Sequence, residues 1–208
     1  MNVLIACEES GIVRDAFRAL GHNAWSCDIQ DGSGDTTYHF KADAVSIAND
    51  MRWDLMIAHP PCTRLANSGV RWLHHPPKGR TLDDMWEELE QGVELYKALR
   101  DAPINFIALE NPVMHKHAST RINPGRRHVV QPWHFGDEAF KATGFELLRL
   151  PDLVHTNKLI PPKKGTEIHK NWSFIHRMPP SPHRSKLRSK SFLGMAQAMA
   201  SQWGNLAI

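Results

Sequence analysis

The chain has 208 residues, of which 41% are hydrophobic, and a formal net charge of +3 with its histidines neutral. This length suffices for one well-packed core and leaves little for a second complete domain. Three cysteines without a C-x-x-C pair argue against a disulfide framework and a structural metal site, and they favour a reducing, cytoplasmic setting. No charged leader precedes the first apolar strand, and no apolar run reaches the roughly 20 residues of a membrane span.

The N-terminal part of the sequence alternates strand, loop, helix and strand. Residues 2–7 are predicted to form a buried strand, and a helix follows over 12–20, where apolar residues recur at helical spacing before Gly21. A second strand over 23–29 carries Asp28 near its end. This order is typical of a nucleotide-binding unit, in which a loop and a helix N-terminus meet the ligand and an acid on the next strand contacts ribose.

The loop in that unit, Ala6-Cys7-Glu8-Glu9-Ser10-Gly11, departs from the usual dinucleotide fingerprint. It has a single glycine, and its two acids would repel a pyrophosphate. A cofactor with no phosphate and a positive centre, such as S-adenosylmethionine, would tolerate acids there. Asp28 could instead be a turn acid. Asp43 stands where a third acid could contact the adenine amine of the cofactor, and a helix-start acid is the alternative interpretation.

The segment Trp53-Asp54-Leu55-Met56-Ile57-Ala58-His59-Pro60-Pro61-Cys62 reads as an apolar strand that ends on two prolines and a cysteine. Proline fixes φ and donates no hydrogen bond to a strand ladder, so the two prolines should end the strand in a rigid turn. Cys62 would then lie beyond the carboxyl end of a strand, where α/β proteins hold their ligands. An inert cysteine at a strand end is the alternative.

A second strand end carries a polar pair. An amphipathic helix over 82–100, whose apolar stripe is core packing, precedes an apolar strand over 105–109 that ends on Glu110-Asn111-Pro112. A carboxylate at a strand tip is usually a cap or an ion-pair partner. Two strand tips that carry Cys62 and Glu110 favour a catalytic site instead.

Basic residues dominate the sequence between positions 163 and 190. Glu167 is the single acid there, against Lys163, Lys164, Lys170, Arg177, Arg184, Lys186, Arg188 and Lys190. Five prolines between positions 161 and 182 exclude a long helix and predict an extended loop layered on the core. A solvated basic surface is the common explanation of such a run, but Trp172 and Phe174 add stacking surface and favour contact with nucleic acid.

These motifs resemble the DNA cytosine-5 methyltransferases, and specifically their very small, phage-type members, over nearly the whole chain. Val3 to Phe17 is similar to the family's cofactor loop and helix, Pro60-Pro61-Cys62 to its nucleophile motif, and Glu110-Asn111-Pro112 to its Glu-Asn-Val motif. The stretches 131–136, 141–144 and 194–204 are similar to segments of the small phage-type proteins.

The resemblance implies a Rossmann-like α/β methyltransferase fold that uses S-adenosyl-L-methionine. The catalytic core would span 1–150, a basic DNA-contacting segment 151–190, and a C-terminal helix over 191–208 would pack back on the core. The protein would be located in the cytoplasm, which is that of the host cell if a phage encodes the protein. Residues expected at the cofactor are Cys7, Glu8, Ser10, Gly11, Asp28, Ile29, Asp43 and Pro60.

The resemblance also implies methyl transfer to C5 of cytosine in DNA. Cys62 would add to C6, Glu110 would protonate N3, and Asn111 would shape the pocket. The family's Gln-x-Arg-x-Arg motif, whose Arg holds the base O2, is missing from the sequence. Arg121 is our preferred substitute because it closely follows the Glu-Asn-Pro loop, ahead of Arg126, Arg127 and Lys141. Phosphate contact or a solvated charge is the alternative for all four.

Only about 40 residues, 151–190, are available for target recognition, so specificity should be short, relaxed or lent by a partner or a second copy of the chain. An amino-methyltransferase would need an acid or amide where His59 stands and an aromatic where Cys62 stands. A thymidylate-synthase-like enzyme would need His where Thr63 follows the cysteine. A modified sulfonium donor and a DNA-binding homologue without turnover are two further alternatives.

Overall fold

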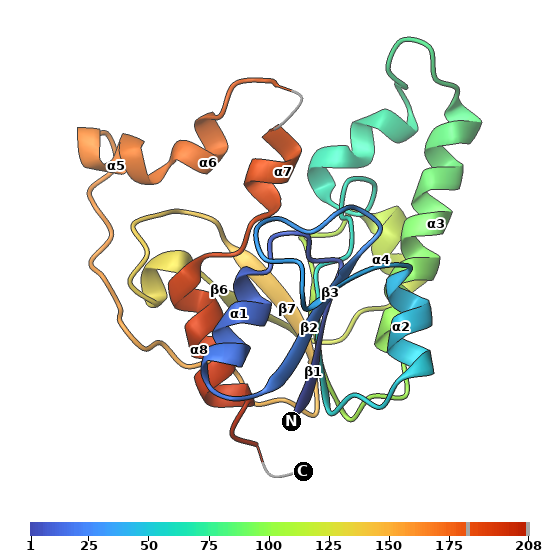
Figure 1. Cartoon of the computed structure of the whole chain (residues 1–208). Helices are drawn as coiled ribbons and strands as arrows, with labels where there is room; N and C mark the ends of the chain where they lie inside the picture. The colour runs from blue at the N-terminus through green and yellow to red at the C-terminus, as the bar shows by residue number, and fades with distance from the viewer. Residues whose placement is uncertain (182–183, 207–208) are drawn as a thin grey trace.

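The computed structural model describes residues 1–181 and 184–206. Its strands are β1 (Asn2–Ala6), β2 (Asn23–Asp28), β3 (His39–Lys41), β4 (Leu55–Ala58), β5 (Phe106–Glu110), β6 (Arg127–Val130) and β7 (Thr143–Leu148). In this part of the chain they form one seven-stranded sheet in the order β3-β2-β1-β4-β5-β7-β6 (Figure 1). β1 to β5 are parallel, and β7 is antiparallel to both of its neighbours. The predicted Rossmann-like α/β fold class is confirmed.

The strand order places a switch point between β1 and β4. From β1 the chain builds outward through β2 to β3, whereas β4 is laid on the other side of β1 and is followed by β5. Ala58 at the end of β4 is level with Ala6 on β1 and Leu109 on β5. The crevice outside the carboxyl ends of β1 and β4 is therefore where an open α/β sheet binds ligands.

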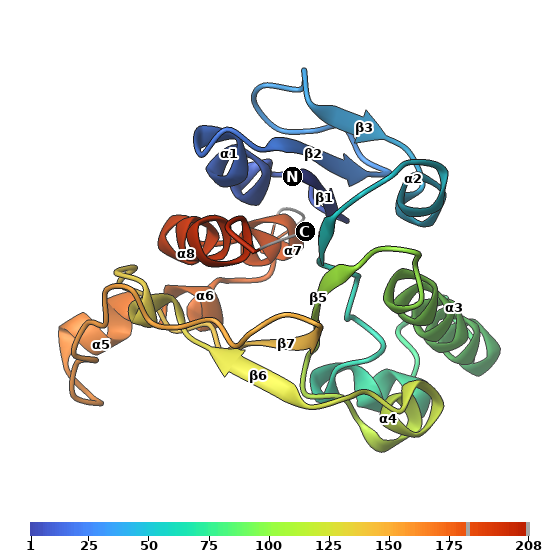
Figure 2. The ribbon, with the colours of Figure 1, turned by 90° about the horizontal axis from the view of Figure 1, so that it is seen from below.

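Helices cover both faces of the sheet (Figure 2). α1 (Ile12–Ala19) and α8 (Leu193–Trp203) pack on each other over one face, and α2 (Ala44–Asp50) and α3 (Leu82–Arg100) lie over the other. The central strands read as continuous apolar runs because both of their faces are buried. On β1, Val3 and Ile5 join the core beneath α1 and α8, whereas Leu4 and Ala6 join the core beneath α2 and α3.

The termini of the two long helices follow from their sequences. Thr81 and Asp84 form a capping box at the start of α3, which spans the predicted residues Leu82–Arg100. Trp203 at the end of α8 is fully buried and its indole N–H donates to the Pro151 carbonyl oxygen at 3.1 Å. The predicted C-terminal helix thus packs on the core as far as Trp203, while residues 207–208 of its predicted range lie outside the described residues.

The extended loop predicted for the basic segment is wrong in part. Residues 151–166 form no helix or strand, but three short helices follow, namely α5 (Glu167–Trp172), α6 (Phe174–Arg177) and α7 (Arg184–Ser189). Prolines prevent a long helix without preventing helices of one or two turns. Thr166 caps α5 by accepting from the His169 N–H, and Trp172 and Ile175 are buried. Pro182 and His183 of this segment lie outside the described residues.

The remaining elements are shorter. α4 (Lys116–Ile122) packs on α3, and two 3-10 helices, η1 (Asn67–Leu73) and η2 (Pro132–His134), lie after β4 and β6. Within residues 1–181 and 184–206, no helix combines the length and the apolar character needed to cross a membrane.

Candidate active site

The turn after β4 holds Cys62 at the surface. The His59 N–H donates to the Ala6 carbonyl oxygen at 2.9 Å, which extends the ladder with β1 by one residue, and Pro60 is buried behind it. The Cys62 carbonyl oxygen accepts from the N–H groups of Leu65 and Ala66 at 3.0 and 2.9 Å. This turn fixes the Cys62 backbone while the residue as a whole stays exposed. The predicted thiol at an open strand end is present.

Glu110 is the last residue of β5, the strand beside β4, and its carboxylate faces His59. The His59 Nδ1 lies 2.8 Å from Glu110 Oε2. The following Asn111 is buried, with its N–H donating to the Gly144 carbonyl oxygen at 2.7 Å and its carbonyl oxygen accepting from Arg127 Nε at 2.6 Å. These two bonds tie the Glu-Asn-Pro loop to β6 and β7 and so hold Glu110 beside the Cys62 turn.

The charges around Cys62 act in opposite directions. Although the residue is exposed, partial burial of its thiol and then the Glu110 carboxylate raise the pKa of Cys62 above its ordinary value. Lys141 and Arg188 oppose this rise in pKa. Cys62 is therefore a thiol at neutral pH in the free protein, and nearby cations are in place to stabilise the thiolate as it forms.

Glu110 behaves differently. Burial alone would raise the pKa of its carboxyl, but the hydrogen bond and charge of His59, followed by the charges of Lys141 and Arg127, hold the pKa below its usual range. Lys141 is itself largely enclosed, and burial lowers its pKa. Its Nζ donates to the carbonyl oxygens of Ser189 and Lys190.

Arg121, our preferred substitute for the arginine that would hold the base, lies away from Cys62 and Glu110, so this prediction is wrong. Its Nε forms an ion pair with Glu90 on α3 at 2.6 Å, and its Nη1 donates to the His117 carbonyl oxygen. Closeness in sequence to Glu110 misled the prediction, because α4 carries Arg121 to the outer side of α3. Lys141, one of the alternatives, is the cation that acts on both Cys62 and Glu110.

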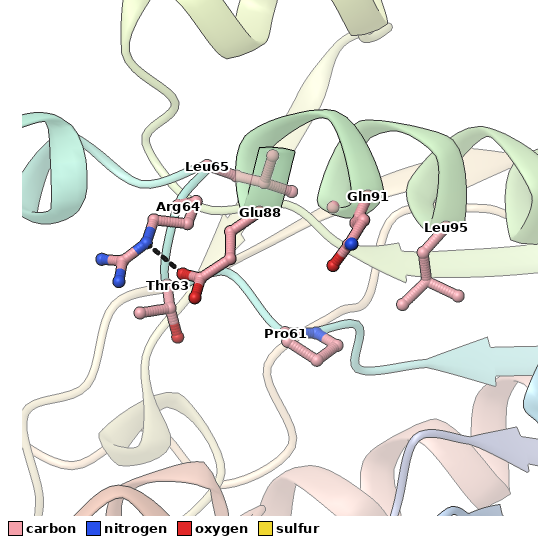
Figure 3. A pocket seen from close by; sticks show the side chains of 8 residues that line it. Pro61, Thr63, Arg64, Leu65, Glu88, Gln91 and Leu95 are labelled. Atoms are coloured by element: carbon pink, nitrogen blue, oxygen red, sulfur yellow. Dashed lines mark hydrogen bonds and ion pairs between the residues drawn. The ribbon is translucent and has the colours of Figure 1, made fainter. Parts of the chain in front are cut away.

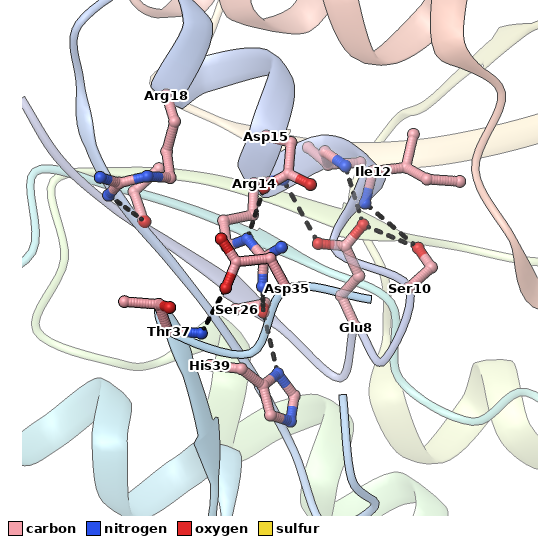
Figure 4. Close-up of polar contacts among 12 residues, drawn as sticks. Glu8, Ser10, Ile12, Arg14, Asp15, Arg18, Ser26, Asp35, Thr37 and His39 are labelled. Atoms are coloured by element: carbon pink, nitrogen blue, oxygen red, sulfur yellow. Dashed lines mark hydrogen bonds and ion pairs between the residues drawn. The ribbon is translucent and has the colours of Figure 1, made fainter. Parts of the chain in front are cut away.

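The loop after β1 is tightly constrained. Cys7 has a left-handed φ of 57°, and Gly11, which begins α1, has a φ of 72°. Burial and then Asp28 raise the pKa of Cys7 to about 12, so this thiol is not a nucleophile at neutral pH. Ser10 donates from its hydroxyl to Glu8 Oε1 at 3.1 Å (Figure 4).

The Glu8 carboxylate, expected to face a positively charged cofactor, serves the helix instead. It is buried and accepts from the N–H groups of Val13 and Arg14 at 2.8 and 3.3 Å, which are donors that the start of α1 leaves unpaired (Figure 4). Its neighbour Glu9 points to the other side, where it accepts from the Ser33 hydroxyl and pairs with Lys186 on α7 at 3.0 Å.

The other expected cofactor residues lie at the ends of β2 and β3. Asp28 ends β2 and accepts from the Gln30 N–H through Oδ1, and the side chain of Ile29 beside it is 73% exposed. Asp43 begins α2, where its Oδ2 accepts from the N–H and hydroxyl of Ser46. The helix-start alternative for Asp43 is thus what the structure shows, while Asp28 and Ile29 remain open to a ligand.

The basic segment reaches the site through α7. Arg188 acts on Cys62, Lys186 pairs with Glu9, and the carbonyl oxygens that follow α7 accept from Lys141. Of the eight predicted DNA-contacting residues, Arg184 and Lys190 are half-buried, whereas the exposed ones are Lys163, Lys164, Lys170, Arg177, Lys186 and Arg188. Lys170 is paired with Glu167 at 2.8 Å.

A hollow of about 260 Å³ lies between the Cys62 turn and α3 (Figure 3). Arg64 and Glu88 pair across it at 2.6 Å, and its other lining residues are Pro61, Thr63, Leu65, Gln91, Gly92 and Leu95. Within the described residues, no group of three or more His, Cys, Asp or Glu side chains could hold a metal ion.

The sequence matches no protein-family model and no curated protein. Its fold is similar to that of a solved structure from E. coli, a candidate DNA modification methyltransferase encoded within a prophage, at 18% identity and a TM-score of 0.47 over 78% of this chain. It is also similar to the Entamoeba histolytica methyltransferase EhMeth, at 14% identity and a TM-score of 0.45 over 79% of this chain. The chain spans about half the length of these structures, 52% and 57%. These similarities concern the fold.

Proposed function

We propose that this protein is a DNA methyltransferase that transfers a methyl group from S-adenosyl-L-methionine to C5 of cytosine, through a covalent bond between Cys62 and C6 of the base. The observation that carries the proposal is the placement of the exposed residue Cys62 beside the Glu110 carboxylate on the neighbouring strand end, with Lys141 acting on both. Thiol addition to a pyrimidine and protonation of its ring nitrogen require this pair of groups.

The loop and strand ends beside β1 and β2 fit the cofactor. The left-handed Cys7 and Gly11 bend the backbone around the switch point, Asp28 offers a carboxylate to ribose hydroxyls, and the exposed Ile29 offers an apolar contact to a purine. Glu9 and the absence of further glycines disfavour a pyrophosphate. When bound, S-adenosyl-L-methionine supplies an electrophilic methyl group.

The protein's own residues make C5 reactive. Cys62 gives its proton to solvent water as Sγ bonds to C6, and the electron pair of the C5–C6 double bond becomes available at C5. Glu110 delivers a proton to N3 as negative charge develops on the ring, and Lys141 supplies positive charge in the place of the missing Arg. After transfer, C5 gives its proton to solvent water, Glu110 takes back the proton on N3, and the Sγ–C6 bond breaks, which regenerates Cys62 and the aromatic ring.

A cytosine in duplex DNA has to leave the base stack to reach Cys62, at a cost of a few kcal/mol. The helices α5 and α6 lie on the same edge of the molecule as α7, which borders the site (Figure 1). All three helices carry exposed cations. Their contacts with phosphates would offset that cost and would weaken with added salt.

The test of the proposed function is the intact mass of the protein after incubation with S-adenosyl-L-methionine and an oligonucleotide that contains 5-fluorocytosine. Fluorine at C5 blocks the last elimination, so we expect a stable adduct that carries the methyl group. Peptide mapping should place it on Cys62 and leave Cys7 and Cys27 unmodified. Cys62→Ala should abolish the adduct, and Glu110→Gln should slow its formation by roughly 100-fold or more.

Glu87→Gln is the matched control for Glu110→Gln, because Glu87 is exposed on α3 and undergoes the same chemical change. It should form the adduct at the wild-type rate. An adduct that lacks the mass of the methyl group would point to a different donor. DNA binding without any adduct, across varied sequences, would contradict the proposal and favour a homologue without turnover.

A further inference from the structure

His59 is a buried side chain for which the proposed reaction gives no role. It follows β4 directly, and its side chain is 10% exposed. Because β4 lies between β1 and β5, the ring is placed between Glu8, which lies after β1, and Glu110, the last residue of β5. The charge of His59 acts on both carboxyls and opposes the rise in pKa that burial causes in each.

The hydrogen bonds of the ring are incomplete. Nδ1 lies 2.8 Å from Glu110 Oε2, so Nδ1 carries the hydrogen when Glu110 is ionised. Nε2 is buried, and the described residues offer it no hydrogen-bond partner. An unpaired buried nitrogen is destabilising and is rarely retained in a protein without a use.

We propose that His59 is the positioning residue for Glu110 and the source of the proton that Glu110 delivers to the base. The inference rests on the proposed function. The His59 ring starts as an imidazolium with a hydrogen on each nitrogen. The Nδ1 proton passes to the Glu110 carboxylate and ends on N3 as the bond from Cys62 Sγ to C6 forms. His59 is then neutral with its remaining hydrogen on Nε2, and Glu110 is again a carboxylate. The proton returns by the same route when Cys62 leaves.

The surroundings of the pair support this direction of transfer. The charged groups that act on this pair or are acted on by it are Glu8 after β1, Cys62 after β4, Arg127 on β6 and Lys141 before β7. Arg188 on α7 acts on Cys62 and Lys141. Arg127 and Lys141 stabilise an ionised Glu110, so Glu110 takes up a proton only when negative charge develops on the bound base. A carboxyl in so cationic a setting needs a neighbour that can resupply its proton.

Three substitutions separate positioning from proton supply. His59→Asn keeps an N–H donor at the position of Nδ1 but cannot ionise, His59→Phe removes both, and His75→Asn is the matched control at an exposed histidine. The rate of adduct formation with 5-fluorocytosine is measured from pH 5.5 to 9. In the wild type we expect the rate to fall at the alkaline end, because the proposed transfer starts from a protonated ring. His59→Asn should be roughly 10- to 100-fold slower and lack that alkaline fall, and His59→Phe should be slower still.

A second measurement needs neither cofactor nor DNA. Carboxyl ¹³C NMR should show the pKa of Glu110 below its usual range in the wild type and raised in His59→Phe, because burial is then left unopposed by His59. His59→Asn should give an intermediate shift, which keeps the test usable if the Phe variant fails to fold. His75→Asn should leave both the pH profile and the pKa of Glu110 unchanged.

The outcomes distinguish the two proposals. A wild-type protein that forms no adduct contradicts the proposed function, whatever the His59 variants do. A wild-type protein that forms the adduct, together with a His59→Asn variant that keeps the wild-type rate and pH profile, overturns the inference about His59 alone. An unchanged pKa of Glu110 in the His59 variants overturns the positioning role as well.

Discussion

The loop after β1 shows how single residues constrain the site. Cys7 has a φ of 57°, at which its β carbon approaches the following carbonyl and strains the backbone. This conformation places the Glu8 N–H to donate to the Cys27 carbonyl oxygen at 3.1 Å. The Arg14 side chain is also buried here, and its Nη1 donates to the Ser26 hydroxyl at 3.2 Å (Figure 4). The guanidinium lies against Gly11, which leaves that position no room for a β carbon.

Gly11→Ala and Gly34→Ala provide a matched pair that measures this crowding. Both glycines have a φ of 72°, but a β carbon at Gly11 would lie 2.5 Å from Arg14 Nη2, whereas nothing lies within 4 Å at Gly34. Gly34→Ala should lower the free energy of unfolding by about 1–2 kcal/mol through backbone strain alone. Gly11→Ala should cost at least about 1 kcal/mol more, because Arg14 must leave its buried partners. Urea unfolding measures both, and equal losses would show that the guanidinium shifts freely.

The strand-end positions of Cys62 and Glu110 could be predicted from the sequence, but the residues around them could not. Cys62 and Glu110 each follow an apolar run that proline ends, so local patterns placed both at strand ends. Lys141 acts on them from a point about 30 residues beyond Glu110, brought there by the antiparallel return of β7. His59 stands in the motif itself, and its meeting with Glu110 depends on the register of β4 and β5, which single strands do not reveal.

At the scale of whole elements, long amphipathic or apolar stretches were predictable and short ones were not. The helix over Leu82–Arg100 has the predicted bounds, and the predicted strands and helix in the first 30 residues agree with β1, α1 and β2 within two residues. β3, β6 and β7 have mixed polarity, and their pairing comes from neighbouring strands. The helices α5 and α6 form between prolines because buried side chains anchor them, Trp172 in α5 and Ile175 in α6.

α7 is held across the site by two side chains from the core, Lys141 and Glu9. Lys186→Gln removes the pair with Glu9, in which Glu9 is 11% exposed, and Lys163→Gln removes the same charge from a residue outside any helix. Hydrogen exchange of the α7 amides should become roughly 2- to 5-fold faster in Lys186→Gln, the range expected for one partly exposed ion pair. Lys163→Gln should leave it unchanged. The same acceleration in both variants would assign the effect to net charge and contradict a specific tether.

At the scale of the whole molecule, the two cores depend on parts of the chain that are far apart in sequence. The core beneath α1 is completed by α8, and residues 151–166, which precede α5 to α7, contact β6 and η2 without forming a helix or strand. Leu153 is buried there, and the N–H groups of Asn157 and Leu159 donate to the carbonyl oxygens of His134 and Trp133. His155 stacks on His134 with ring centroids 3.8 Å apart. This histidine pair makes the docking sensitive to acid.

Burial, followed by the charges of His155 and Lys158, lowers the pKa of His134 from 6.5 to about 4. Its Nδ1 accepts from the Gln131 N–H, which requires a neutral ring. Unfolding therefore takes up a proton as the pH falls, so His134 stabilises the fold fully above about pH 6.5 and loses that contribution down to about pH 4. Glu8 and Asp137, whose pKa values burial raises, act in the opposite direction, so the wild type has to be compared with a variant.

His134→Asn keeps an acceptor for Gln131 but cannot ionise. Between pH 7 and pH 4.5 its urea midpoint should fall less than that of the wild type, whereas His176→Asn, at an exposed histidine, should follow the wild type. Equal losses in all three proteins would place the acid sensitivity outside the His134–His155 pair.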